Sequence, residues 1–97
     1  MKFSDYQTED LRLAILLLLT EANEYTINEF LLQQVLVENG HSVGQDKLRN
    51  ELTWLQEQSL LELKNTASLY VATLNTRGLD VAKGRSKCPG VKKPMPT

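Results

Sequence analysis

The sequence predicts one small α+β domain that is mainly helical, with three helices followed by a two-stranded hairpin and a short fourth helix. Three observations lead to this fold class. Residues 13–19 are all apolar, leucines recur at helical spacing over residues 48–55, and apolar and polar residues alternate over residues 61–72. A chain of 97 residues that is 41% hydrophobic has enough apolar side chains for a single core.

The first helix is expected over residues 8–22, because the Thr8 hydroxyl is a suitable N-cap and two acidic residues follow it. Its apolar run "LAILLLL" would span roughly 10 Å, against about 30 Å for the hydrocarbon core of a bilayer. We therefore expect a central helix of a globular domain and no contact with a membrane. One small domain cannot cover such a helix on every side, so Leu16 and Leu19 are expected in a homodimer interface.

A second helix is expected over residues 28–39, where Thr26 or Asn28 can cap the first turn and Asn39-Gly40 can end the last. Its predicted apolar residues are Phe30, Leu31, Leu32, Val35 and Leu36. A short turn, in which Ser42 can act as a cap, leads to a third helix over residues 44–58. The predicted buried stripe of that helix consists of Leu48, Leu52, Leu55 and Ser59.

The alternation over residues 61–64 and 69–72 predicts a β-hairpin, with residues 65–68 as its loop. The stretch "LNTRGLDVAKG" then predicts a short helix, with Asn75 or Thr76 as its cap and Gly84 at its end. Residues 85–97 are rich in Pro, Gly and Lys, so we expect a flexible tail there. The predicted organisation is a domain of residues 1–84 and a tail of residues 85–97.

This order of elements, with a tight turn between the second and third helices, is typical of a winged helix-turn-helix. The chain also resembles a family of small, uncharacterised winged-helix proteins of Mu-like phages and prophages. The resemblance covers nearly the whole chain and is carried by "LRLAILLLLTEA", "INEFLLQQVLVENGHSV", "DKLRNELTWLQEQSLLEL" and "YVATLNTRGLDVAKGRSKCPGVKKPMP". The stretch "LRNELTWLQEQSLLEL" is similar to the recognition-helix-to-wing passage of many bacterial regulators, and "ATLNTRGLDVA" resembles the passage after the wing. The resemblance implies a phage or prophage protein in the host cell.

The net charge of −1 hides an uneven distribution. Residues 1–76 carry five basic and eleven acidic side chains, whereas residues 77–97 carry six basic side chains and one acidic side chain. Such a basic segment can contact nucleic acid or an acidic partner, or it can fold back on its own acidic body. The single cysteine, Cys88, permits no internal disulfide, which is consistent with a cytoplasmic protein.

In a winged helix-turn-helix, the third helix enters the major groove of double-stranded DNA and its first turns reach the base edges. Arg49 could read guanine and Asn50 could read adenine, because their hydrogen-bonding groups match those bases. The predicted DNA contacts of the third helix are Gln45, Lys47, Arg49, Asn50 and Thr53. The predicted contacts of the wing and tail are Lys64, Asn65, Arg85, Lys87, Lys92 and Lys93. Transcriptional control is the corresponding function.

The acidic body leaves a second interpretation open. Asp46, Glu51 and Glu57 stand among the basic residues of the third helix, and Lys47 with Glu51 could form an ordinary solvated pair. Since a fold does not fix a function, the alternative is a protein-interaction adaptor for phage assembly or for a host factor. A joint positive surface of helix, wing and tail would favour DNA, whereas dominance of the three acids would favour a protein partner.

Nothing in the sequence indicates catalysis. It contains no glycine-rich phosphate loop, no nucleophile with a base at recognisable spacing and no cluster of His and Cys. We therefore expect no enzymatic activity and no cofactor, and the lone His41 predicts no metal site. Trp54 lies between the buried and exposed faces of the third helix, and we expect it to cover the core edge against the wing.

Overall fold

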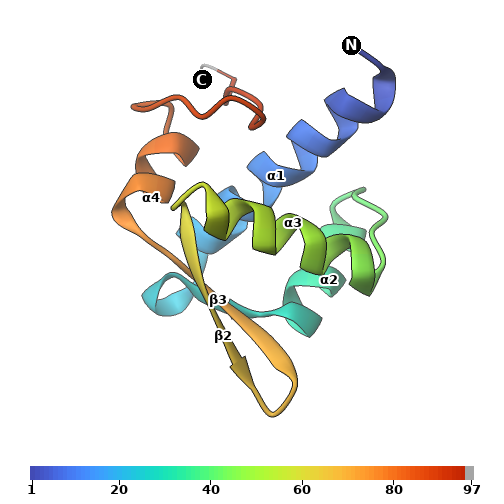
Figure 1. The fold of residues 1–97 in the computed structure, drawn as a ribbon, viewed down its shortest axis with the longest axis vertical. Coiled ribbons are helices and arrows are strands. Elements are labelled where there is room, and N and C mark those ends of the chain that lie inside the picture. Colours follow the sequence, from blue (N-terminus) through green and yellow to red (C-terminus); the bar gives the residue numbers. More distant parts are fainter. Residues whose placement is uncertain (96–97) are drawn as a thin grey trace.

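The computed structural model describes residues 1–95, which form four α-helices and a small antiparallel sheet whose β2–β3 hairpin extends away from the helices (Figure 1). The helices are α1 (Phe3–Glu21), α2 (Glu29–Glu38), α3 (Gln45–Glu57) and α4 (Thr76–Ala82). The strands are β1 (Thr26–Asn28), β2 (Leu61–Thr66) and β3 (Leu69–Leu74), and a 3-10 turn, η1 (Asn23–Tyr25), precedes β1. The predicted class, α+β and mainly helical, is confirmed.

Helix α1 begins at Phe3, so Thr8 lies within the helix rather than at its cap. The backbone N–H of Lys2 donates to the carboxylate of Asp5 at 3.1 Å, and the N–H of Asp5 donates to the Lys2 carbonyl at 3.0 Å. An acidic residue in the first turn also stabilises the positive end of the helix dipole. These contacts extend α1 toward the N-terminus, and its first turns project beyond the rest of the molecule (Figure 1).

The apolar run of α1 forms the centre of the core, because α2, α4 and β3 all pack against this helix. Leu16 and Leu19 have no exposed surface in the monomer, so the prediction that they form a dimer interface is wrong. Each such leucine contributes about 1.5–3 kcal/mol through its burial. In the same run, Leu17 keeps 39% of its surface exposed. No helix within residues 1–95 is long and apolar enough to cross a membrane.

Helix α2 begins as predicted, because the side chain of Asn28 caps it by accepting from the backbone N–H of Leu31 at 3.0 Å. Not all of the apolar residues of α2 are buried in the core. Leu32 and Leu36 are fully buried, whereas Phe30 and Leu31 are exposed, contrary to the predicted stripe. An apolar face therefore remains on the outer side of α2.

Helix α3 has its N-cap at Gly44 and not at Ser42. The leucines of its predicted stripe, at positions 48, 52 and 55, are fully buried as expected. Ser59, the last position of that stripe, lies beyond the helix and is exposed. Glu51, expected on the surface, is instead buried beside the leucines.

The predicted hairpin is present, and it is longer than expected because Ala67 and Ser68 alone form its turn. Both have positive φ angles, +51° and +64°, as a tight two-residue hairpin turn requires. Strand β1 was not predicted, since three residues are too few to show a periodic pattern. It pairs antiparallel with β3, which places β3 at the centre of the sheet order β1-β3-β2.

Helix α4 packs closely against the chain that precedes β2. The side chain of Asn75 caps α4 as predicted, by accepting from the N–H of Gly78 at 2.8 Å. A Cβ atom at Gly78 would lie 2.0 Å from the carbonyl oxygen of Leu60, so this approach requires glycine. Gly78 belongs to the stretch "ATLNTRGLDVA", so one residue of that stretch is required by the packing of α4.

Residues 85–95, predicted to belong to a flexible tail, turn back onto the body (Figure 1). Cys88 and Val91 are buried, and the backbone N–H of Lys92 donates to the carbonyl of Glu9 at 3.2 Å. The described part of the tail is therefore continuous with the core, and residue 84 does not mark its boundary. Residues 96 and 97 of the predicted tail lie outside the described residues.

Candidate nucleic-acid interface

A buried carboxylate joins α2, α3 and the β2–β3 hairpin. Glu29, the first residue of α2, is 1% exposed and accepts two hydrogen bonds from the Arg49 guanidinium, at 2.7 and 2.8 Å. The side chain of Gln45 and the backbone N–H of Tyr70 donate to the same carboxylate. Arg49 also donates to the carbonyl of Ser68 at 2.8 Å and lies over the Tyr70 ring at 4.4 Å. The cluster fixes α3 relative to the hairpin.

The electrostatics of this cluster change the predicted role of Arg49. The hydrogen bonds from Arg49 lower the pKa of Glu29 from 4.5 to about 2, although burial alone would raise it. Arg49 is therefore held by an ionised, buried partner. The Arg49 guanidinium is thus bound to Glu29 and Ser68 rather than free to read guanine, and the exposed Gln45 also donates to Glu29, at 3.3 Å.

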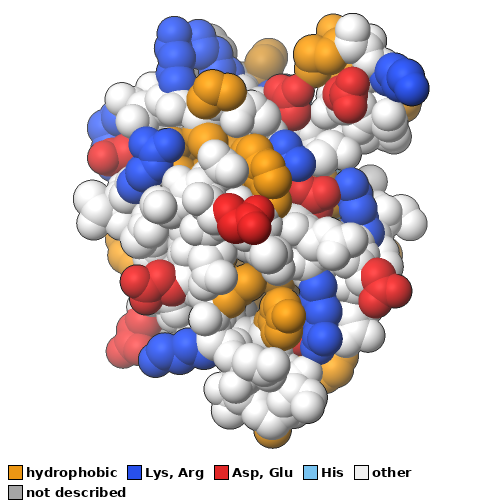
Figure 2. Space-filling view, in the orientation of Figure 1, with side chains coloured by type: hydrophobic (Ala, Val, Ile, Leu, Met, Phe, Trp, Pro, Cys, Tyr) orange, Lys and Arg blue, Asp and Glu red, His pale blue; other side chains and the backbone are white. Residues whose placement is uncertain are grey.

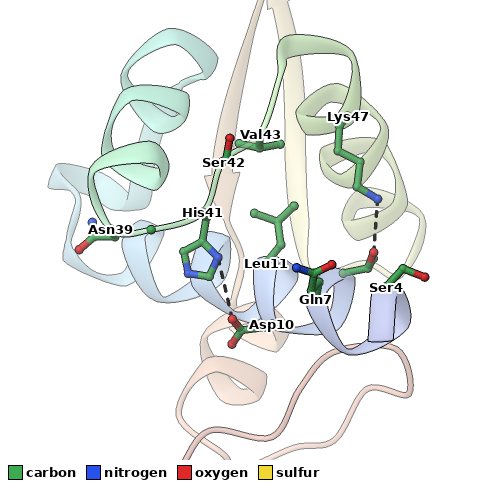
Figure 3. Close-up of a pocket in the computed structure, with 11 residues that line it drawn as sticks. Ser4, Gln7, Asp10, Leu11, Asn39, His41, Ser42, Val43 and Lys47 are labelled. Carbon is green, nitrogen blue, oxygen red and sulfur yellow. Dashed lines mark hydrogen bonds and ion pairs between the residues drawn. The ribbon is translucent and has the colours of Figure 1, made fainter. Parts of the chain in front are cut away.

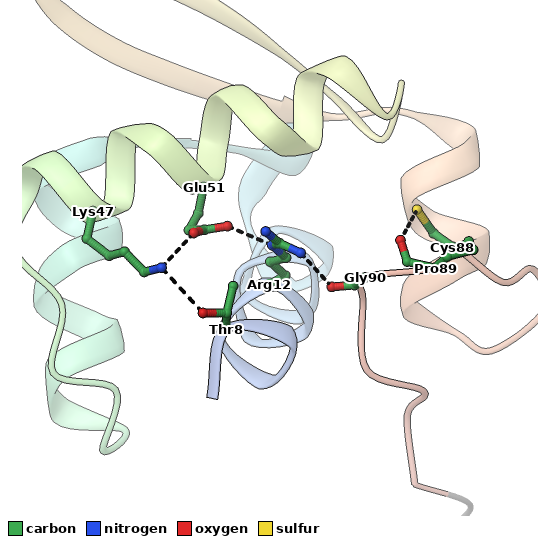
Figure 4. A network of polar contacts seen from close by, with 7 residues as sticks. All are labelled: Thr8, Arg12, Lys47, Glu51, Cys88, Pro89 and Gly90. Atoms are coloured by element: carbon green, nitrogen blue, oxygen red, sulfur yellow. Dashed lines mark hydrogen bonds and ion pairs between the residues drawn. The ribbon is translucent and has the colours of Figure 1, made fainter. Parts of the chain in front are cut away.

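A second network joins α1, α3 and the tail (Figure 4). Arg12 donates to the Glu51 carboxylate at 2.6 Å and to the Gly90 carbonyl at 2.9 Å, and its guanidinium lies 3.7 Å from the centre of the Trp54 ring. Lys47 contacts the other Glu51 oxygen at 2.8 Å, the pair expected at i,i+4. Burial raises the pKa of Glu51, but the hydrogen bonds from Lys47 and Arg12 outweigh it and lower that pKa below its ordinary value.

Trp54 covers the edge of the core, as predicted, and the tail packs against it. A Cβ atom at Gly90 would lie 2.8 Å from the indole ring, so the tail backbone lies directly on it. Glu51, one of the three acids weighed against DNA binding, is neutralised by two cations. Asp46 and Glu57 remain exposed on α3.

The outer face of α3 is polar and carries charges of both signs (Figure 2). Asn50 and Thr53 are exposed, and neither side chain forms a hydrogen bond within residues 1–95. They are the predicted contacts of this helix that remain available to a ligand. Lys47 is half exposed, although it pairs with Glu51.

The hairpin continues this surface. The side chain of Gln56 on α3 accepts from the backbone N–H of Leu63 in β2 at 2.8 Å, which ties the hairpin to the helix. Lys64 and Asn65, the predicted contacts of the wing, are exposed near the far end of β2. They lie outside the Glu29 network, so their side chains are accessible.

The tail cations fall into two groups. Arg85 pairs with Asp80 at 3.0 Å, and Lys92 pairs with Asp10 at 3.2 Å, so both predicted phosphate contacts have intramolecular partners. Lys87 and Lys93 are exposed, and neither has a carboxylate within 4.0 Å in residues 1–95. Because the tail folds back, it cannot act as the extended arm that its composition predicted.

A polar hollow of about 540 Å³ lies between the first turns of α1 and the connection from α2 to α3 (Figure 3). His41 points into it toward Asp10, with 3.9 Å between the imidazole nitrogen and the carboxylate. Lys47 extends across it and donates to Thr8 at 3.3 Å.

The residues that organise this surface are mostly ones that the sequence did not single out. The partner of Glu29 on α3 and the partner of Glu51 on α1 lie on other elements, so no local pattern reveals them. Arg12 did carry a signal, since it lies between Leu11 and Leu13 at the start of an apolar run. A cation in that position is expected to be partly buried and to need a partner.

The chain is similar to two proteins of comparable length. It is 45% identical over 93 residues to the uncharacterized protein gp26 of Escherichia phage Mu, covering 96% of each chain. It is 36% identical over 95 residues to an uncharacterized protein of Haemophilus influenzae, covering 92% of each. No family model and no solved structure matches it. At this identity over nearly full length, the chain belongs to the family of small phage-related proteins that includes gp26 of phage Mu.

Proposed function

We propose that this protein is a winged helix-turn-helix DNA-binding protein of phage or prophage origin, acting in transcriptional control in the host cytoplasm. In this proposal α2 and α3 form the helix-turn-helix, α3 is the recognition helix, and the β2–β3 hairpin is the wing. The observation that carries it is an exposed α3 face whose orientation to α2 and the hairpin is fixed by the buried Glu29–Arg49 pair.

The chemistry of that face suits base contacts by neutral groups. The Asn50 amide offers one donor and one acceptor, the pattern that matches adenine in the major groove. Thr53 lies close to one turn further along the same face. Lys64 on the wing is available for a phosphate, whereas Lys47 is half exposed but already pairs with Glu51. Arg49 acts indirectly in this scheme, by holding the recognition helix in place.

Fluorescence anisotropy with a labelled duplex from the region upstream of the protein's own gene tests this proposal. Asn50→Ala is expected to weaken binding about 5- to 100-fold, the loss of one bidentate base contact, with little effect on a scrambled duplex. Asn23→Ala is the matched control, because Asn23 is exposed in η1, away from α3. Absence of binding by the native protein at about 50 mM salt would refute the proposal.

A specific observation favours a second candidate, a protein-interaction adaptor for phage assembly or for a host factor. Phe30, Leu31 and Val37 on α2 keep 61%, 49% and 51% of their surfaces exposed. This strip, rather than Leu16 and Leu19, is also the surface on which the predicted homodimer would form. Loss of phage production in a Phe30→Ser variant, with normal production in Asn50→Ala, would support the adaptor over the DNA-binding protein.

A further inference from the structure

The folded tail and the end of α4 enclose a hollow of about 730 Å³ with an apolar floor and a basic rim. Its floor includes the buried side chains of Val81, Cys88 and Val91. Its rim carries four lysines, which are Lys83, Lys87, Lys92 and Lys93. Figure 2 shows basic side chains gathered at the end of the molecule where Figure 1 places the tail.

Most of this positive charge is not neutralised within the protein. Lys92 pairs with Asp10, but Lys83, Lys87 and Lys93 have no carboxylate within 4.0 Å in residues 1–95. Glu9 is the one acidic residue among the described residues that line the hollow. The hollow therefore has an excess of positive charge on a molecule whose remaining surface is acidic.

Lys87 and Lys93 both lie on this rim. The positive charge of Lys87 nearby lowers the pKa of Lys93. Like charges in contact are unfavourable unless an anion lies between or beside them. Because Lys83, Lys87 and Lys93 surround one hollow without carboxylate partners in residues 1–95, their charges favour a bound anion there.

The shape of the hollow is fixed by the backbone and not by the lysines. Gly90 adopts a φ of +97°, its carbonyl accepts from Arg12, and its Cα lies against the Trp54 ring of α3. The Lys92 N–H is bound to the Glu9 carbonyl. Figure 4 shows Arg12 between α3 and the tail, so the tail backbone that lines the hollow is fixed to α3.

We propose that this hollow binds a phosphate group of the DNA backbone, flanking the contact that α3 makes. The inference rests on the proposed DNA-binding function and assigns the site to Lys83, Lys87 and Lys93. Lysine ammonium groups are compact charges suited to phosphate oxygens, and an apolar floor strengthens their field in the hollow. The sequence predicts Arg85 and Lys92 as DNA contacts, and the proposed phosphate site does not use them. It uses Lys83, which the sequence does not predict.

The test compares the salt dependence of DNA affinity for the native protein and the Lys87→Gln/Lys93→Gln variant. Each lysine that neutralises one phosphate contributes about 0.9 to the slope of log affinity against log salt, or about eightfold in affinity at 0.1 M salt relative to 1 M. We expect the slope of the double variant to be smaller than the native slope by up to two contributions of about 0.9. Lys2→Gln is the control, because Lys2 is exposed and does not line the hollow, and we expect about a twofold change or less.

Each outcome decides a different point. A native slope in the double variant, with DNA binding intact, overturns the phosphate site and leaves the proposed function standing. An equal loss in Lys2→Gln also overturns the site, because net charge alone would then explain the effect. Absence of binding by the native protein overturns the proposed function itself. Circular dichroism of each variant checks the fold, because the substitution of exposed lysines should not alter it.

Discussion

The Glu29→Gln substitution probes the buried pair that orients α3. The Glu29 carboxylate is 1% exposed and accepts hydrogen bonds from Arg49, Gln45 and Tyr70. Glutamine has nearly the same shape, but it removes the charge and gives one oxygen instead of two. We expect a protein that still folds but is less stable near neutral pH.

The size of the effect follows from the pKa of Glu29, which falls from 4.5 to about 2 in the folded protein. A shift of this size corresponds to about 3 kcal/mol of stability. Because the folded-state pKa is the lower one, this contribution is fully present above pH 4.5. It is lost progressively as the pH falls from 4.5 toward 2, where the carboxylate becomes protonated in both states.

Urea unfolding followed by circular dichroism, between pH 7 and pH 2.5, measures this difference. The gap in unfolding free energy between the native protein and Glu29→Gln should be about 3 kcal/mol at pH 7 and should shrink below pH 4. Glu38→Gln is the matched control, because Glu38 is an exposed carboxylate at the other end of α2. A gap equal to that of the control, or one that does not change with pH, would refute the reasoning.

Two further predictions concern packing. Leu16→Ala should lower the free energy of unfolding by about 2–5 kcal/mol and leave the oligomeric state unchanged, because Leu16 is fully buried in the monomer; light scattering at several concentrations checks the second point. Gly90→Ala should release the tail, because its Cβ would meet the Trp54 ring at 2.8 Å and its φ is +97°; trypsin should then cleave the tail lysines faster than in the native protein, and an unchanged rate would contradict this.

Local signals in the sequence predicted much of the fold. Asn28 and Asn75 are good caps, and both do cap the helices that follow them. The leucines of α3 recur at helical spacing, and they are buried. These features depend on neighbours within one helix turn, so a single sequence contains all the information that they need.

The parts that were missed depend on contacts between distant residues. Strand β1 exists because β3 pairs with it, and the tail packs because Trp54 and Arg12 provide a surface for it. Leu16 and Leu19 are wrongly predicted at a dimer interface because the sequence does not show that α4 and β3 pack against α1. In the candidate site, Arg49 was correctly placed on α3, but its buried partner on α2 could not be inferred.

The most direct test of the DNA-binding proposal is a titration of the ¹⁵N-labelled protein with duplex DNA, followed through the backbone amide signals. The account predicts the largest shifts in α3 at Asn50 and Thr53, with further shifts in β2 around Lys64. Shifts concentrated on the outer side of α2, at Phe30 and Val37, or no shifts at about 50 mM salt, would contradict it.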